Sequence, residues 1–267
     1  MTLLRKYAGV YAIMLRNSLI REMNFQANFL LWMAVELLWF IGQVIFIEVI
    51  FGYVDRIGDW TKWEVVLLVG THQIISQIFQ AFFYVNLANL PELIRTGRLD
   101  FLLLQPIDTQ FAVSTKQFGL DNLVNALIGV AFITVALVKL QVVPTASQLG
   151  LFAVAAVFGV MIHYSILFCL AAVSFWIVRS QGLIYGYYSL FNLGRYPDVI
   201  YRGMFKFVFS WLIPVIVVTN IPVRLLIRMT DSPLHLMLQL AGAALLVTAA
   251  TRLFWLAALK RYSSASS

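Results

Sequence analysis

The sequence predicts an all-α membrane protein with about six transmembrane helices, and two observations support this fold class. Apolar residues make up 61% of the 267 residues and charged residues 12%, whereas a soluble domain is about half apolar and one-quarter charged. Two long windows, residues 65–91 and 140–178, contain no charged side chain. Each exceeds the roughly 20 residues that a helix needs to cross the hydrocarbon core, so lipid is the expected solvent.

The net charge agrees with a membrane protein and does not require a nucleic-acid partner. The formal charge is +7, and the basic residues fall mostly at the edges of apolar stretches. At such edges they set orientation and meet anionic lipid headgroups. We therefore expect membrane lipid, and no nucleic acid, as a partner. The one cysteine, Cys169, lies inside an apolar stretch and indicates no disulfide framework.

The first part of the chain predicts an interfacial helix followed by two spans. Residues 3–23 place basic side chains among apolar ones at helical spacing, which is typical of a helix lying in the membrane interface. Residues 27–52 carry only Glu36 and Glu48 as charges and predict the first span. After a polar loop, residues 63–84 predict the second span.

The middle of the chain alternates between a polar segment and further spans. Residues 86–112 are the most polar internal region and predict a loop that contains a short helix. The third span is expected at residues 116–138 and the fourth at residues 148–178, the latter long enough to be tilted. The last clear span is expected at residues 234–259. We expect one transmembrane domain over residues 1–267.

Residues 180–231 allow two paths through the membrane. In the first, residues 182–198 form the fifth span and residues 203–230 fold into a re-entrant helical hairpin. In the second, residues 205–226 form the fifth span. Both paths give six crossings.

Basic residues in the short loops indicate the orientation, because cytoplasmic loops carry an excess of lysine and arginine. With the amino terminus inside, the basic residues on the cytoplasmic side outnumber those outside, and both termini are expected in the cytoplasm. The second path fits this rule better, since the first puts Arg195, Arg202 and Lys206 near the outer face. The predicted cytoplasmic set is Arg5, Lys6, Arg16, Arg21, Arg95, Arg98, Lys116, Arg179, Lys260 and Arg261.

Polar side chains inside the first two spans mark a candidate path. An ionisable group near a helix centre costs roughly 2.5–3.5 kcal/mol on insertion scales, so Glu36 is expected to face protein or water. Glu36 and Gln43 share one stripe of the first span, and Gln73 and Gln77 share one on the second. These side chains predict the lining of a path for a polar head group, or hydrogen bonds between helices, and the two interpretations are compatible.

Motifs of catalysis are absent from the sequence. It contains no glycine-rich phosphate loop ending in lysine and a hydroxyl residue, no histidine pair at metal spacing and no nucleophile elbow. We expect no catalytic residue, no metal site and no enzymatic activity in this chain. If it is a transporter, energy must come from a partner or from a gradient.

Several segments resemble bacterial type-2 ABC exporter permeases. The cytoplasmic loop of that family is similar to residues 86–111, NLANLPELIRTGRLDFLLLQPIDTQF, and the run PELIRTGRLD is the specific part. The resemblance covers nearly the whole chain, with one departure at Gly203, where the family pattern has proline. Further matches are NFQANFLLWMAVELLW at 24–39, GDW at 58–60, RYPDVIY at 195–201 and IP at 213–214.

The resemblance implies a six-span permease subunit of an exporter in the bacterial inner membrane. Such a subunit pairs with a second permease chain and with ATP-binding cassette subunits, which bind ATP and magnesium, while this chain binds no cofactor. It moves an unidentified substrate, lipid-like or amphiphilic, by alternating access. The family also favours the first path for residues 180–231 and adds Asn192 to the path lining. The residues implied in docking on the ATPase are Pro91, Glu92, Arg95, Arg98 and Asp100.

Two other classes of function are weighed against this one. A secondary transporter driven by a gradient needs a coupling site, and the spans offer only Glu36 and Asp121 as acids at depth. A membrane-embedded enzyme that modifies lipid needs clustered acids or histidines near one interface, and the sequence shows no such cluster.

Overall fold

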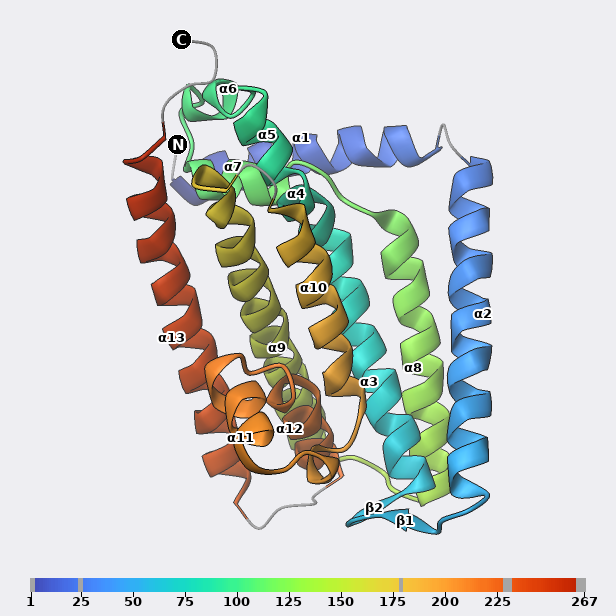
Figure 1. Ribbon diagram of the computed structural model, residues 1–267. Coiled ribbons are helices and arrows are strands. Elements are labelled where there is room, and N and C mark those ends of the chain that lie inside the picture. Colours follow the sequence, from blue (N-terminus) through green and yellow to red (C-terminus); the bar gives the residue numbers. More distant parts are fainter. Residues whose placement is uncertain (1–2, 24–25, 178–179, 228–231, 263–267) are drawn as a thin grey trace.

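The computed structural model describes residues 3–23, 26–177, 180–227 and 232–262 as a bundle of long helices (Figure 1). The long helices are α1 (Leu3–Met23), α2 (Gln26–Phe51), α3 (Lys62–Phe79), α8 (Leu120–Leu140), α9 (Ala146–Ala172) and α13 (Pro233–Leu259). The shorter ones are α4 (Val85–Ala88), α5 (Leu90–Arg95), α6 (Asp100–Leu103), α7 (Thr109–Thr115), α10 (Gln181–Phe191), α11 (Gly203–Phe207) and α12 (Val217–Leu226). Single turns are the π-helices η1 (Gln80–Tyr84) and η5 (Val208–Leu212) and the 3₁₀ helices η2 (Val173–Phe175), η3 (Asn192–Arg195) and η4 (Asp198–Ile200).

A small strand pair closes the loop between α2 and α3. Strand β1 (Arg56–Ile57) pairs antiparallel with β2 (Trp60–Thr61), and Gly58 in the turn adopts a positive φ of 63°. Such a φ is readily available to glycine and costly for other residues. The prediction of an all-α protein therefore holds for the bundle, and this hairpin is a local addition to it.

Capping groups mark where two of the long helices begin. The backbone N–H of Thr61 donates to the Glu64 carboxylate at 2.6 Å ahead of α3. Ahead of α9, the backbone N–H of Thr145 donates to the Gln148 side chain at 2.8 Å. Both are capping boxes, which satisfy backbone donors that a helix start otherwise leaves unpaired.

Among the described residues, five helices are long and apolar enough to cross a membrane. They are α2, α8, α9, α13 and the continuous helical run from α3 to α5, Lys62–Arg95. Helices α11 and α12 pass the same test only as a pair bent by 82°. The prediction of an all-α, multi-span membrane protein is confirmed.

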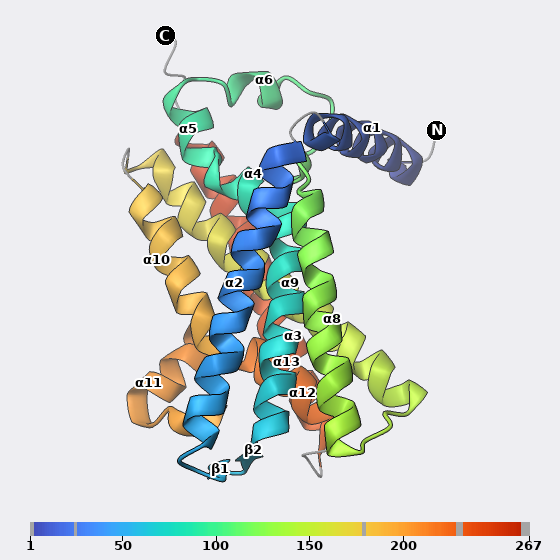
Figure 2. The ribbon, with the colours of Figure 1, turned by 90° about the vertical axis from the view of Figure 1, so that its right-hand side faces the viewer.

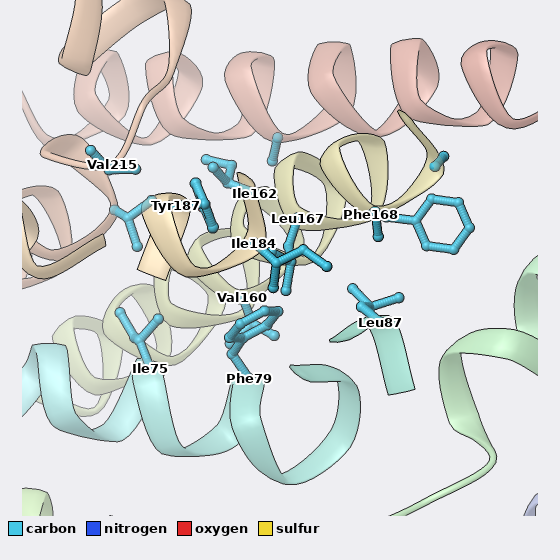
Figure 3. Packing of buried hydrophobic residues seen from close by; sticks show 14 of the residues in the cluster. Ile75, Phe79, Leu87, Val160, Ile162, Leu167, Phe168, Ile184, Tyr187 and Val215 are labelled. Atoms are coloured by element: carbon cyan, nitrogen blue, oxygen red, sulfur yellow. The ribbon is translucent and has the colours of Figure 1, made fainter. Parts of the chain in front are cut away.

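The core of the bundle centres on α3 and α9, and α8 packs closely against α3. Helices α3 and α8 approach closely at Gly70 and Gly129, where an added Cβ on Gly129 would lie 2.8 Å from the Gly70 carbonyl oxygen. Small residues at such crossings let backbones approach and gain van der Waals contact. Phe79 of α3, Leu167 of α9 and Tyr187 of α10 belong to the larger buried cluster, which is shown in Figure 3.

Helix α1 lies across one end of the bundle and is not aligned with the long helices (Figures 1 and 2). Helices α5, α6 and α7 and the final turns of α13 lie at the same end, which we call the α1 end. The opposite end carries β1 and β2 and is called the β end. Helix α1 is fastened to α7 and its flanks, since Tyr7 OH accepts from Asp108 N–H at 2.9 Å and Ser18 Oγ accepts from Phe118 N–H at 3.2 Å.

Residues 180–227 contain a short helix followed by a bent pair. Helix α10 has 11 residues, fewer than the roughly 20 of a full span. In Figure 1 it starts at the α1 end, while α11 and α12 both lie toward the β end. The predicted hairpin extends to residue 230, and its last residues, from 228 on, lie outside the described part of the chain.

The observed helix limits differ from the predicted spans in three places. Residues 86–112, predicted as a loop with one short helix, contain four short helices, because leucines of this segment such as Leu87, Leu90 and Leu99 are fully buried. The fourth span was predicted to end at residue 178, but α9 and η2 end at Phe175, and residue 178 is outside the described part. Helix α8 starts at Leu120, later than the predicted 116, after the extended backbone of Gly119.

Candidate functional site

A polar cavity of about 170 Å³ lies between α2, the α3–η1 run and the α10–η3 segment. Every residue predicted to line a path contributes to it: Glu36, Gln43, Gln73, Gln77 and Asn192. Six further residues complete the lining: Trp39, Phe40, Ser76, Gln80, Tyr188 and Arg195. The structure thus brings together polar side chains from three segments that are far apart in the sequence.

Glu36 is the acceptor that joins α2 to α3. Its Oε1 accepts a hydrogen bond from Gln73 Nε2 at 2.8 Å and another from Gln77 Nε2 at 2.7 Å. Gln73 and Gln77 are one turn apart on α3, 8% and 2% exposed, so their amide groups point to the same carboxylate. The buried Oε1 of Gln77 has no hydrogen-bond partner within the described chain and leaves an acceptor available beside the cavity.

The α10 side of the cavity supplies a positive charge. Arg195 Nη2 donates to the Asn192 side-chain oxygen at 2.6 Å, which orients the guanidinium on η3. Arg195 and Glu36 line the same cavity without an ion pair between them in the described structure. The cavity therefore offers a carboxylate, a guanidinium and several amides to a polar group that enters it.

The cavity opens beside large exposed side chains. Trp39, which lines it, is 64% exposed, and neighbouring Leu38 on α2 is 68% exposed. On α10, Tyr185 is 65% exposed. Exposed apolar surface around a polar site is expected in a membrane, where lipid or another membrane helix covers it.

The two central histidines belong to the core and do not line the cavity. His72 Nε2 lies 3.2 Å from the Phe191 carbonyl oxygen, and His163 Nδ1 lies 2.7 Å from Tyr187 OH. The His163 ring also packs edge-on against Phe191, with centroids 3.6 Å apart. These contacts fasten α10 to α3 and α9. Within the described residues, no group of three or more His, Cys, Asp or Glu side chains could hold a metal ion.

The residues predicted to dock on an ATPase lie together at the α1 end. Pro91 is buried at the start of α5, while Arg95 and Arg98 are exposed. Glu92 forms a hydrogen-bonded ion pair with Arg95 at 2.8 Å. Asp100 begins α6 and is partly buried.

A clamp that sequence reasoning missed fixes this end to the long helices. Asp108, at the start of α7, accepts from Arg252 Nη1 and Nη2 on α13 at 3.2 and 2.6 Å, and from Phe111 N–H at 3.0 Å. Gln110 accepts from Arg252 at 2.9 Å and donates to Tyr164 OH on α9 at 3.0 Å. Burial raises the pKa of Asp108, but the bonds from Arg252 and Phe111 outweigh it and leave the pKa below its ordinary value.

A second ionic cluster, also missed from the sequence, lies at the β end. Arg224 on α12 contacts Asp198 at 2.8 Å and Asp59, in the β1–β2 turn, at 3.1 Å. Lys206 on α11 contacts the same Asp198 at 3.2 Å. The bent pair is thereby tied to the loop between α2 and α3. No local sequence pattern predicts these contacts, because the partners are up to 165 residues apart in the chain.

Comparison with known proteins gives one family. A family model described as ABC-2 family transporter protein matches residues 37–266. No curated protein and no solved structure matches the chain. The matched range includes the short helices at the α1 end, both ionic clusters and every lining residue of the polar cavity except Glu36, which lies one residue before it.

Proposed function

The chain belongs to the ABC-2 transporter family, and on that premise we propose that it is one half of an exporter whose path runs through the polar cavity at Glu36. It is the membrane permease component of such a transporter. We propose that it pairs with a second permease chain and with ATP-binding subunits, which bind ATP and magnesium.

The observation that carries this proposal is the gathering of Glu36, Gln73, Gln77, Asn192 and Arg195 in one cavity within a bundle of apolar helices. Placing a carboxylate at membrane depth is costly, and a path for a polar group accounts for that cost. Helix α2, which covers the cavity, is itself lightly packed: only 11% of its 18-residue apolar stretch is buried. A lightly packed helix over a polar cavity suits a gate that moves as the transporter switches between inward and outward openings.

The α1 end is proposed as the cytoplasmic face, where the ATP-binding subunits dock. Arg95, at the end of α5, and Arg98, in the turn before α6, are exposed and offer charge to a partner. The Asp108–Arg252 clamp connects this segment to α13, and Gln110 connects it to α9. A push on the short helices therefore has a rigid route into the long ones. In this orientation both termini are cytoplasmic, in the inner membrane of a bacterium.

We propose that α10 and η3 form the fifth crossing and that α11 and α12 form a re-entrant hairpin at the outer face. The 82° bend between α11 and α12 and their shared position toward the β end support this path. Arg224 and Lys206 are then held at the outer face by Asp198 and Asp59. Pairing with acids accounts for basic residues at a face where the orientation rule disfavours them.

The substrate class that fits best is an amphiphile with a charged polar head. The cavity pairs a carboxylate and a guanidinium with apolar Trp39 and Phe40 in its wall. Amides in the wall bind donors and acceptors alike. An amphiphile can keep its apolar part in lipid while its head crosses through such a cavity.

Membrane and medium extracts of bacteria that contain or lack the chain test this proposal. We expect mass spectrometry to reveal an amphiphile whose export is lost in cells without the chain. Export is also lost when the ATP-binding partner carries a substituted phosphate-loop lysine, and it falls severalfold with Gln77→Leu. Gln181→Leu, an exposed change on α10 outside the cavity, serves as the control. Export that continues with the inactive ATPase would indicate a gradient-driven transporter and contradict the proposal.

A further inference from the structure

A separate cavity of about 340 Å³ lies between α2, α3 and α8, on the β-end half of these helices. The three helices run side by side in Figures 1 and 2. Its volume is within the range of about 300–1,000 Å³ that holds small ligands. The lining residues are Val44, Ile47, Glu48, Trp63, Val66, Ala131, Phe132 and Val135.

Charged side chains lie at the rim of this cavity, and apolar side chains lie deeper in it. On α3, Lys62 and Trp63 precede buried Val66, and on α8, Lys139 follows Val135 by one turn. Glu48 similarly follows the apolar residues of α2 toward the β end. All three helices therefore place charged groups at the rim and apolar groups deeper in the membrane.

The rim carries an excess positive charge. Lys62 Nζ pairs with Glu48 at 2.6 Å and lies 5.2 Å from the centroid of the Trp63 ring. Lys139 Nζ lies 5.7 Å from the same ring, is exposed, and makes no ion pair within the described chain. Two ammonium groups and one carboxylate thus surround Trp63, a residue type enriched at the membrane interface.

We propose that this cavity is a binding site for an anionic phospholipid. One acyl chain occupies the apolar cavity, and the phosphate lies against Lys139 and Lys62 at the β-end interface. Each basic residue near an anionic headgroup favours binding, and the apolar wall excludes water from the chain. The site is distinct from the cavity at Glu36 and does not depend on any transport activity.

The larger apolar cavity between α9, α10 and α13 shows why the rim matters. It measures about 720 Å³, and no charged side chain contributes to its lining. Such a cavity can accept any acyl chain but cannot select a headgroup. The smaller cavity has the apolar wall and the charged rim together, so it can select both parts of a phospholipid.

Native mass spectrometry of the full-length chain in detergent tests the site, with phosphatidylglycerol and phosphatidylethanolamine added in equal amounts. We expect the wild-type chain to retain phosphatidylglycerol preferentially. Lys139→Gln lowers its affinity about fivefold by removing one ammonium group. Ala131→Phe, which fills the cavity, removes the tightly retained lipid, and Val135→Phe does the same if the first variant fails to fold.

Two matched control positions, one just ahead of α8 and one on it, lie outside the cavity. Lys116→Gln removes a lysine just ahead of the opposite end of the helix, and Leu127→Phe adds bulk to a position that is 64% exposed. Both are expected to retain phosphatidylglycerol as the wild type does. Equal retention of the two lipids by the wild type, or unchanged retention by a folded cavity-filling variant, would overturn the proposal. So would a loss with Lys116→Gln as large as with Lys139→Gln.

Discussion

Helices α2 and α3 are neighbours that both belong to membrane-span candidates, yet α3 is buried in protein and α2 is mostly exposed. In the run that contains α3, 78% of the span window is buried, compared with 11% in α2. The buried helix is the one richer in polar side chains, including His72, Gln73 and Gln77. In lipid the polar helix gains from protein partners, while the apolar helix loses little by facing acyl chains.

The two helices meet at the carboxylate of Glu36. Its two bonds from Gln73 and Gln77 give α2 a polar link to the core, while much of the surface of α2 stays exposed. Helix α3 therefore belongs to a packed scaffold, whereas α2 is a lightly packed helix joined to it at Glu36. The predictions below test that difference, starting with the largest expected effect.

Bulk added to the α3–α8 crossing should destabilise the scaffold most. In Gly129→Val the new side chain meets the Gly70 carbonyl oxygen, which lies only 2.8 Å from an ideal Cβ. We expect the free energy of unfolding to fall by about 1–3 kcal/mol or more, as overpacking does elsewhere. Unfolding by SDS titration in mixed micelles measures it. The matched control is Gly42→Val on α2, where a Cβ meets nothing within 4 Å, and equal losses in the two variants would remove the distinction between the helices.

Removal of the shared acceptor should weaken the α2–α3 link. Glu36→Leu leaves the amide groups of Gln73 and Gln77 without their carboxylate and should cost about 1 kcal/mol, a typical value for polar contacts between membrane helices. Glu36→Gln keeps an acceptor oxygen and should restore most of the loss. A double-mutant cycle with Gln77→Leu isolates the interaction. A coupling energy near zero would mean that other contacts hold α2.

Helix α13 is, like α2, a peripheral helix, since only 22% of its 18-residue apolar stretch is buried. The Asp108–Arg252 clamp joins it to the segment at the α1 end. Arg252→Ala should lower the free energy of unfolding by about 1 kcal/mol, since both partners are partly exposed. Arg252→Lys should not restore it, because lysine cannot make the two-pronged contact.

The Asp108–Arg252 clamp should also make the free energy of unfolding depend on pH. The folded-state pKa of Asp108 is lowered, so its contribution is present above the pKa of the unfolded chain and is lost as pH falls through the folded-state value. The stability difference between wild type and Arg252→Ala should therefore stay constant from about pH 8 to pH 5 and shrink only below about pH 4. Thermal unfolding across this range measures the difference, and a decline already at pH 6 would contradict the assignment.

The smallest effect on stability is expected at Arg95 on the exposed surface of α5. Arg95→Ala breaks a solvent-exposed pair with Glu92 and should leave the melting temperature unchanged. If the α1 end docks on the ATPase, copurification of the ATP-binding subunit should nevertheless fall at least tenfold. Arg56→Ala, at the β end, is the control. Equal recovery of the subunit with both variants would place the docking surface elsewhere.

The sequence was informative where residues signal through local pattern. The uncharged windows at 65–91 and 140–178 indicated α3 and α9, and the helical spacing of Gln73 and Gln77 indicated that the two amides share a face. Because an acid near the centre of a membrane helix is costly, the sequence also indicated that Glu36 must face protein or water. These signals depend only on neighbours within a few turns, so they can be read without the fold.

The rest depended on contacts between distant segments. Arg252 is a lone charge in its span, and only the fold brings it to Asp108, 144 residues away. Gly182 and Gly186 have the spacing of a packing motif, yet a Cβ at either position meets nothing within 4 Å. Close packing in that part of the bundle involves Gly159, against Val218 of α12, and Gly194, against Val215 and Thr219. Spacing alone does not say which face of a helix meets another.

Thiol accessibility tests the central claim that the polar cavity at Glu36 is part of a translocation path. With Cys169→Ser as background, Gln43→Cys places the only thiol in the cavity, and Ile45→Cys places one on the same helix at a position that is 57% exposed and outside the lining. In membranes that contain the native ATP-binding partner, a water-soluble thiol reagent should label Gln43→Cys at a rate that changes when ATP is added. Ile45→Cys should stay unlabelled, because residues two apart point to different sides of a helix. Equal labelling of the two positions, or no labelling of Gln43→Cys in any nucleotide state, would contradict the account.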